Sequence, residues 1–330
     1  MNDFHDHSPD PGEIAAKYVE DIQPLIRYCY NCQPWEGGQI AVWVQGERTD
    51  LVDLFGDAGV PADEEVRKEL AAQLECLNCG TAGFDLATEV GIESKWEREL
   101  GERFVRAQEL YAEKISDFQG FLERTPMLGA AHEFGELIFK AMRAPTAPRC
   151  KASGKFFRAR PAEGARLFDK KDLDAPPEGK ALDARFNHAG QTVLYLACSE
   201  EVALSEAAGD EPSALLWLQE FELAPVAPIL DLSVRSVDLS DDQILFFALL
   251  EFDALEKRGG LPGSTWKPGY LLTRFIADCA NRSGYVGIRY PSAHAGGDNL
   301  VIFERESLTP KLSVIGEPRS IAWKRRRWKF

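Results

Sequence analysis

Two C-x-x-C pairs constrain the fold of this chain more than any other sequence feature. Cys29 and Cys32 form the first pair, in C-Y-N-C, and Cys76 and Cys79 form the second, in C-L-N-C-G. Each pair places two thiolates on one tight turn, and two such turns complete a tetrahedral zinc shell with Zn–S bonds of about 2.3 Å. The 43 residues between the pairs must then fold back to bring the two turns together.

These four cysteines predict a structural Zn²⁺ site. A catalytic zinc site is not expected, because four sulfur ligands leave no open position for water. A second interpretation stays open, in which the cysteines are buried as small apolar side chains or form a redox dithiol. The other three cysteines are scattered along the second half of the chain, at Cys150, Cys198 and Cys279.

Length and composition are those of a folded protein with two domains or one large domain. The 330 residues are 45% apolar and 28% charged, which argues against a disordered or fibrous chain. No apolar run approaches the length of a membrane-spanning helix, about 18 residues, and residues 1–11 lack the basic and apolar regions of a signal peptide. We expect a cytosolic, soluble protein without a membrane partner.

Charge is distributed unevenly along the chain. Residues 1–150 carry 14 basic and 28 acidic side chains, whereas residues 151–330 carry 24 and 25. The net charge of −15 argues against nucleic acid as a partner. The basic segment 324–330 is interpreted as a solvated tail, or as a segment that docks onto the acidic first half within one chain or between the chains of a homo-oligomer.

The charge change coincides with a predicted domain boundary. Two prolines interrupt a helical pattern at 143–149, so we place a linker at about 143–152 and domains at 1–148 and 149–330. The first domain is predicted to be mainly helical, with helices at Glu64–Cys76, Glu93–Phe121 and Phe134–Met142 and a short strand at Gly38–Val44.

The second domain alternates short strands with helices, which predicts an α+β fold. Predicted strands are Lys155–Arg160, Thr192–Ala197, Ala214–Leu223, Ile229–Asp231, Gly284–Tyr290 and Asn299–Glu304. Predicted helices are Ser199–Ala208, Asp241–Lys257 and Gly269–Ser283.

Several common catalytic motifs are absent from the sequence. It contains no G-x-x-x-x-G-K-[ST] phosphate loop, no G-x-G-x-x-G opening a helix and no G-x-S-x-G elbow, and His132-Glu133 lacks the second histidine of a zinc protease. The chain has five histidines. These absences exclude P-loop kinases and ATPases, and they leave little material for Ser/His/Asp catalysis.

An ordered set of motifs in the second half carries a family resemblance. In chain order these are R-F-N-x-x-G within 183–190, V-L-Y-L-A within 192–197, A-L-x-E within 199–206, I-R-Y-P-S within 287–292 and G-G-x-N-L-V within 296–301. Together they resemble the RES domain over about 155–305. The cysteine-bearing first half is similar, more loosely, to N-terminal extensions that precede some RES domains.

The resemblance implies an ADP-ribosyltransferase-like fold that consumes NAD⁺ as its substrate, by hydrolysis or phosphorolysis of the nicotinamide–ribose bond. It also implies a toxin restrained by an antitoxin, although the long N-terminal extension puts a separate antitoxin in question. By motif, the catalytic residues are Arg185, Tyr195, Glu206 and Ser292, and Asn299 matches a further polar position that binds NAD⁺.

Residue chemistry agrees with these roles. Cleavage of a bond to a cationic leaving group passes through an oxocarbenium-like transition state and needs no protonating acid, so one carboxylate, Glu206, suffices to stabilise the developing charge. Arg185 offers a planar fork to pyrophosphate or ribose oxygens, and Tyr195 an aromatic face to nicotinamide. Ser292 and Asn299 are suited to orienting the ligand.

Each residue also has an ordinary structural interpretation. Without the family resemblance, Arg185 is expected to be a solvated turn residue, Tyr195 a core residue and Ser292 the end of a strand; the resemblance favours the functional roles. Arg158 and Arg160, two apart on one strand, fit either an NAD⁺ phosphate clamp or a structural ion pair.

Two rival functions remain at this stage. One is an ADP-ribosyltransferase that uses the same NAD⁺ pocket and hands the ADP-ribose to a protein or a nucleotide. The other is a zinc-dependent binding protein whose RES-like half is inactive, against which the presence of Arg185 and Glu206 argues. Product analysis separates the first rival, and NAD⁺ turnover separates the second.

Overall fold

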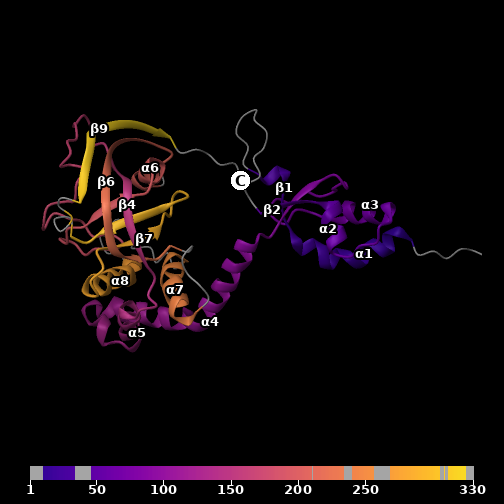
Figure 1. Ribbon diagram of the computed structural model, residues 1–330, viewed down its shortest axis with the longest axis horizontal. Helices are drawn as coiled ribbons and strands as arrows, with labels where there is room; N and C mark the ends of the chain where they lie inside the picture. The colour runs from indigo at the N-terminus through magenta and orange to yellow at the C-terminus, as the bar shows by residue number, and fades with distance from the viewer. Residues whose placement is uncertain are drawn as a thin grey trace, which may run out of the picture. The chain divides into compact units, whose positions relative to one another are not determined.

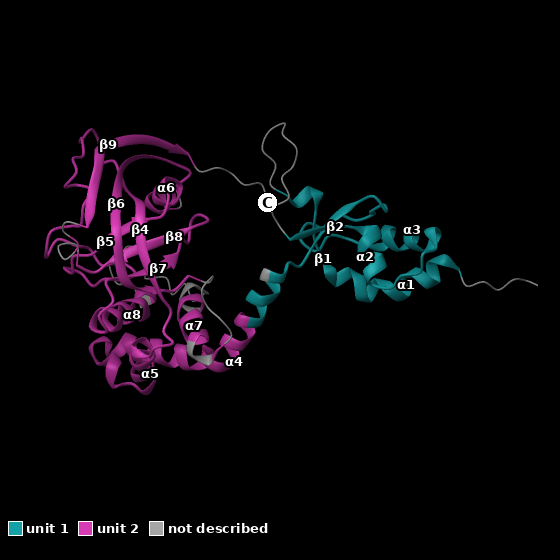
Figure 2. Ribbon diagram, viewed as in Figure 1, with its two compact units in different colours: residues 1–102, 327–330 teal, residues 103–326 magenta. Residues whose placement is uncertain are grey.

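The computed structural model describes residues 10–33, 46–209, 211–233, 240–255, 268–304, 308 and 311–324. The chain divides into two compact units, one reaching Glu102 and the other beginning at Arg103 (Figure 2). The division falls within a single long helix, α4 (Lys95–Arg124). The predicted strand Gly38–Val44 and most of the basic segment 324–330 lie outside the described residues.

The first unit is a small sheet covered by helices (Figure 1). Its strands form an antiparallel sheet in the order β1-β3-β2. Helix α3 confirms the predicted helix from Glu64, and Asp63 caps it by accepting hydrogen bonds from the backbone of Glu65 and Val66. The elements are α1 (Pro11–Ile22), β1 (Ile26–Cys29), β2 (Glu47–Asp50), α2 (Leu51–Asp57), α3 (Glu64–Gln73) and β3 (Glu89–Ile92).

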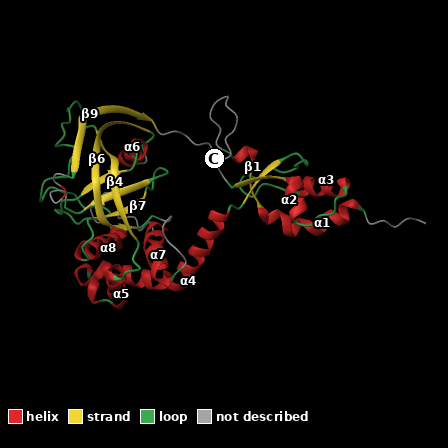
Figure 3. Ribbon diagram, in the orientation of Figure 1, coloured by secondary structure: helices red, strands yellow, loops and turns green. Residues whose placement is uncertain are grey.

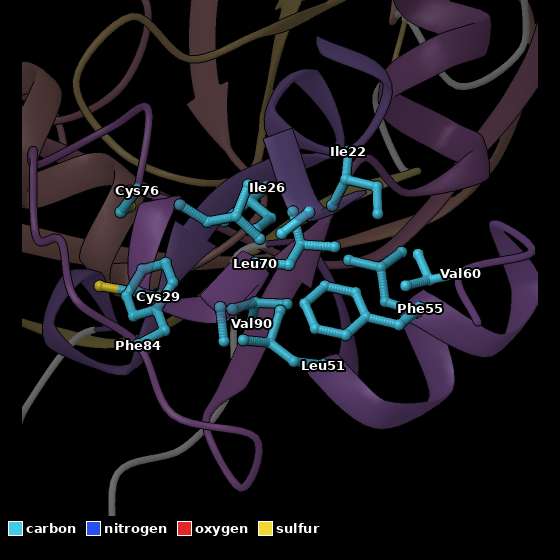
Figure 4. Close-up of a cluster of buried hydrophobic side chains, with 14 of the residues drawn as sticks. Ile22, Ile26, Cys29, Leu51, Phe55, Val60, Leu70, Cys76, Phe84 and Val90 are labelled. Atoms are coloured by element: carbon cyan, nitrogen blue, oxygen red, sulfur yellow. The ribbon is translucent and has the colours of Figure 1, made fainter. Parts of the chain in front are cut away.

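One apolar core joins these elements (Figure 4). Phe55 and Leu70 are fully buried in it, and α1 packs against α3. Cys29 and Cys76 belong to the same cluster, so the first cysteine of each C-x-x-C pair is tied directly to the core. The core and the cysteine pairs therefore depend on each other.

The second unit contains a helical layer that the sequence assigned to the first domain. Helix α4 and α5 (Glu133–Arg143) appear as predicted, but α5 packs against α8 (Leu271–Arg282). The rings of Phe118 and Phe275 lie 5.1 Å apart, centroid to centroid. The packing division therefore falls at Glu102, well before the predicted linker, because the apolar faces of α4 and α5 are buried on a later helix. The predicted linker rested on two prolines and a change in charge balance, and neither feature reports which helices pack together.

A six-stranded sheet forms the centre of the second unit (Figure 3). The strand order is β4-β5-β8-β7-β6-β9, and β4 also pairs with β6, so five strands form a closed circuit. Only the β6–β7 pairing is parallel. The strands are β4 (Arg149–Pro161), β5 (Leu194–Ala197), β6 (Ser213–Asp231), β7 (Gly287–Pro291), β8 (Asp298–Ile302) and β9 (Leu312–Lys324).

Two strands differ from the sequence expectation. The predicted strands Ala214–Leu223 and Ile229–Asp231 are one continuous strand, β6. Strand β9 was not predicted, because Gly316 and Pro318 interrupt its apolar alternation. Gly316 has φ +65°, a conformation that glycine adopts without strain. This conformation accommodates the register shift in the β6–β9 pairing, after which β9 continues along β6.

Helix α6 (Glu200–Ala208) packs against β4, β5 and β6. Ser199 caps it by accepting a hydrogen bond from the backbone N–H of Val202 at 3.2 Å, as its sequence predicts. Helix α7 (Asp241–Leu255) packs against α8. None of the helices within the described ranges is both long and apolar enough to cross a membrane.

Candidate active site and cysteine cluster

A cavity of about 340 Å³ opens beside α6, at the ends of several strands of the second unit. This volume lies in the range of small-molecule sites, about 300 to 1,000 Å³. Five of the predicted site residues line it, from five separate segments of the chain: Arg158, Arg185, Tyr195, Glu206 and Asn299.

The carboxylate of Glu206 is held by three donors on one oxygen. Its Oε1 accepts hydrogen bonds from Ser292 Oγ at 2.6 Å, Asn299 Nδ2 at 2.9 Å and the Ala293 backbone N–H at 3.2 Å. These donors fix the carboxylate on its helix. Oε2 accepts no hydrogen bond from the described residues, and Glu206 lines the cavity.

Ser292 organises the loop between β7 and β8. Besides donating to Glu206, its Oγ accepts the backbone N–H groups of His294 and Ala295, each at 3.2 Å. Its own backbone N–H donates to Gly297 O at 2.9 Å. The serine is thus a positioning residue: it orients the carboxylate and shapes the loop, and it is not itself among the residues that line the cavity.

Gly297 is required by this loop geometry. Its φ of +143° is one that side chains with a Cβ rarely adopt. A Cβ there would also lie 2.8 Å from a methyl carbon of Val202 on α6. The second glycine of G-G-x-N-L-V therefore lets the loop pass close to the helix that carries Glu206.

A tight turn presents Arg185 to the cavity. The turn closes with a hydrogen bond from Ala184 N to Asn187 O at 3.2 Å. The Tyr195 hydroxyl holds it by donating to Asn187 Oδ1 at 3.0 Å and accepting from Phe186 N at 2.9 Å. Burial raises the pKa of Tyr195, so the hydroxyl keeps its proton for this hydrogen bond. Tyr195 is therefore both a cavity wall and the support of the turn.

Arg274 on α8 braces the same turn from outside the cavity. Its Nε donates to Ala184 O at 3.1 Å, and its guanidinium pairs with Asp183 at 2.5 Å. Arg185 itself makes no hydrogen bond to any described residue, although it lines the cavity. A supported turn that carries an arginine without a protein acceptor is suited to an anionic ligand.

Arg158 and Arg160 have different environments. Arg158 lines the cavity; its Nη1 donates to Tyr195 O at 3.5 Å, and its buried Nε has no partner in the described part of the chain. Burial, together with the nearby Arg160 charge, lowers the pKa of Arg158 to about 10. Arg160 does not line the cavity. It donates to Asp172 O at 2.8 Å, pairs with Glu163 at 3.2 Å and lies over the ring of Phe168.

Among the residues that line the cavity, sequence reasoning missed three with ionisable side chains: Tyr270, Tyr290 and His294. Tyr290 is nearly buried, with its ring 4.6 Å from that of Phe186, and burial raises its pKa well above the usual value. A signal for Tyr290 and His294 existed, because Tyr290 lies within I-R-Y-P-S and His294 follows Ser292 by two residues. Tyr270 lies outside every motif used.

The four paired cysteines of the first unit meet in one cluster. Their sulfur atoms all lie within 4.8 Å of one another. The Sγ–Sγ separations are 3.9 Å for Cys29–Cys32, 3.6 Å for Cys29–Cys79 and 3.4 Å for Cys32–Cys76. A tetrahedral shell with 2.3 Å bonds requires sulfur separations of about 3.8 Å. The sulfur positions therefore fit a metal ion of zinc's size and geometry.

The family model for the RES domain matches residues 155–324, just over half of the sequence. The chain belongs to the RES domain family. The match confirms the family that the motifs predicted and extends beyond residue 305 to include β9. It does not cover the cysteine cluster, so the likeness of the first half to the extensions of other RES proteins stays a prediction.

Comparison with solved structures finds the M. tuberculosis MbcT-MbcA toxin-antitoxin complex. The matched chain of that complex is 16% identical to this RES protein, with a TM-score of 0.37. The alignment covers 58% of the present chain and 93% of that chain. No curated protein sequence matches this chain.

Proposed function

We propose that this RES protein cleaves NAD⁺ at the bond between nicotinamide and ribose. The observation that carries the proposal is the Glu206 carboxylate, fixed by three donors on Oε1 and placed in a cavity that it shares with Arg158 and Arg185. Membership of the RES family supports the choice of NAD⁺. The two arginines suit the pyrophosphate of this substrate, and the carboxylate suits its positively charged glycosidic bond.

The chemistry follows from these groups. When the C1′–N bond breaks, nicotinamide leaves as a neutral molecule and positive charge develops on the ribose. Oε2 of Glu206, to which no described donor binds, stabilises this charge. The stabilisation is stronger in the transition state than in the ground state, and this difference accelerates the cleavage. Arg185 and Arg158 bind the phosphate oxygens, and the rings of Tyr195 and Tyr290 form an aromatic wall beside nicotinamide. We assign NAD⁺ binding to Arg158 and not to Arg160, because Arg160 is bonded to Asp172 and Glu163.

For the cell, we propose a cytoplasmic growth-arresting toxin or defence effector. Consumption of NAD⁺ harms the cell that contains the enzyme, so its activity must be restrained. Either a separate antitoxin or an inhibitory contact that involves the first unit supplies that restraint. Transfer of ADP-ribose to a protein or a nucleotide uses the same cavity, and the products distinguish it from hydrolysis and phosphorolysis.

We propose further that the cysteine cluster binds one structural Zn²⁺. Cys29, Cys32, Cys76 and Cys79 would hold it, and their sulfur separations fit the tetrahedral shell. Four thiolates complete the coordination shell, so the ion stabilises the fold of the first unit and takes no part in cleavage.

The decisive experiment measures nicotinamide release from NAD⁺ by the full chain and by Glu206→Gln. We expect a loss of at least ~10²-fold, the usual effect of removing one electrostatic stabiliser of a transition state. Glu201→Gln changes an exposed glutamate on the same helix and should retain the wild-type rate. Chromatography of the adenosine-containing product, with and without phosphate, identifies the acceptor.

The proposal fails if the folded, zinc-loaded wild-type chain releases no nicotinamide. It also fails if Glu206→Gln and Glu201→Gln release nicotinamide at equal rates.

A further inference from the structure

We propose that His294 is the general base that activates water as the acceptor at this site. The inference rests on the proposed NAD⁺ cleavage and adds a catalytic residue that the RES motifs do not contain. His294 lines the cavity together with Glu206 and Arg185. It lies in the loop between β7 and β8, two residues after Ser292.

Hydrogen bonds connect the backbone of His294 to the carboxylate. Its N–H donates to Ser292 Oγ at 3.2 Å, and the same Oγ donates to Glu206 Oε1 at 2.6 Å. The preceding residue, Ala293, donates its own N–H to Oε1 at 3.2 Å. The loop therefore fixes the histidine backbone within two hydrogen bonds of the group that stabilises the ribose cation.

The imidazole of His294 is available for proton transfer. Two other histidines are described, and both are engaged: His132 Nδ1 accepts Phe134 N while its Nε2 contacts Asp117, and His188 Nε2 contacts Asp278 at 2.9 Å. The ring of His294 makes no hydrogen bond within the described ranges, and the residue is exposed at the cavity. Water therefore reaches His294 at the cavity.

The other ionisable groups of the cavity are poor bases for water. Glu206 has three donors on one oxygen, and its other oxygen is assigned to the ribose cation. Burial raises the pKa of Tyr195 and Tyr290, so these phenols stay protonated. The remaining titratable groups of the lining are Arg158, Arg185 and Tyr270. Imidazole is the side chain that accepts a proton most readily between pH 5 and 8.

Water replaces nicotinamide at C1′ of the ribose. The C1′–N bond breaks and its electron pair leaves with nicotinamide, while a lone pair of the water oxygen forms the new C1′–O bond. One proton of that water passes to His294 and then to solvent. The products are ADP-ribose, nicotinamide and one proton. Phosphate, which already carries negative oxygens, attacks without giving up a proton and does not need the base.

This difference between acceptors supplies the test. Nicotinamide release from NAD⁺ is measured for the wild-type chain and His294→Gln between pH 5 and 9, without phosphate and with inorganic phosphate. We expect hydrolysis by the variant to fall ~10²-fold, the usual contribution of a general base. Phosphate-dependent release should fall less than ~3-fold, since no proton is transferred to the base in that reaction.

Two further readouts separate catalysis from a folding defect. The pH profile of hydrolysis by His294→Gln should differ from that of the wild type. His132→Gln, which removes a helix cap away from the cavity, should keep the wild-type pH profile. Added imidazole should restore part of the hydrolysis by His294→Ala.

The assignment is overturned if His294→Gln hydrolyses NAD⁺ at the wild-type rate with the same pH profile. It is also overturned if release falls equally with both acceptors, because His294 would then act in binding or positioning. A wild-type chain that releases no nicotinamide under any condition instead refutes the proposed function, and the assignment fails with it.

Discussion

The cysteine cluster of the first unit and the cavity of the second differ in how many of their polar side chains have a partner within the protein. The four cysteine sulfurs face each other at 3.4 to 3.9 Å in the measured pairs, and the set is complete for one cation. In the cavity, by contrast, Arg158 Nε, the Arg185 guanidinium and the His294 ring have no hydrogen-bonding partner among the described residues.

This contrast separates a resident ligand from an exchangeable one. A closed set of ligands tied to a core binds an ion that stays and stabilises the fold. A buried polar atom without a partner, such as Arg158 Nε, costs free energy unless a ligand satisfies it, whereas the more exposed Arg185 and His294 side chains are open to a ligand. The second arrangement is typical of a site that binds and releases its substrate.

The largest effect is expected from breaking the closed set. Cys76→Ser should reduce zinc from about one ion per chain to a trace and remove the hydrogen-exchange protection of α1 and α3, because Cys76 is also part of the core. Metal analysis and hydrogen exchange by mass spectrometry measure both. Cys150→Ser, a substitution in β4 of the second unit, should leave zinc and protection unchanged. Retained zinc in Cys76→Ser would refute the cluster as a zinc site.

An intermediate effect is expected at the two arginines of β4. Arg158→Gln should raise the KM for NAD⁺ about 10-fold, equivalent to about 1.4 kcal/mol, because it removes a charge that the ligand satisfies. Arg160→Gln should change KM less than about 2-fold and cost 0 to about 1 kcal/mol of stability, as its exposed ion pair allows. Steady-state kinetics measure KM, and urea unfolding measures the free energy of unfolding. Equal KM values would remove Arg158 from the binding site.

The smallest effect on activity is expected at Tyr195, whose hydroxyl supports the turn that carries Arg185. Tyr195→Phe leaves Phe186 N–H and Asn187 Oδ1 without their partner, which should cost about 1–3 kcal/mol of unfolding free energy. KM should rise a few-fold as the Arg185 turn loosens. Tyr285→Phe removes one buried hydrogen bond to Met142 O outside the cavity and should destabilise without changing KM. If both variants alter KM alike, Tyr195 has no special role in positioning Arg185.

Much of the local structure could be predicted because its causes are local. Apolar periodicity identified α4 and α5, a serine cap identified the start of α6, and paired spacing identified the four cysteines that meet in one cluster. The RES motifs supplied four of the predicted site residues that line the cavity: Arg185, Tyr195, Glu206 and Asn299. Strand β9 and the continuity of β6 could not be predicted in the same way, because both depend on pairing with distant strands: β9 pairs along the first part of β6, and β4 pairs with β6 from Leu216 to Leu230.

The sequence by itself determined the chemical types at each motif, the local elements that carry them and the family. Only the tertiary structure decided which of those groups meet. Glu206 reaches Ser292 and Asn299 across 86 and 93 residues, because pairing of β5 and β7 with β8 brings their segments together. The same packing turns the Tyr195 hydroxyl toward the turn of Arg185, gives Arg160 partners outside the cavity, and buries α5 on α8. Spacing along a chain describes neighbours on one element, whereas burial and hydrogen bonding depend on contacts between elements far apart in sequence.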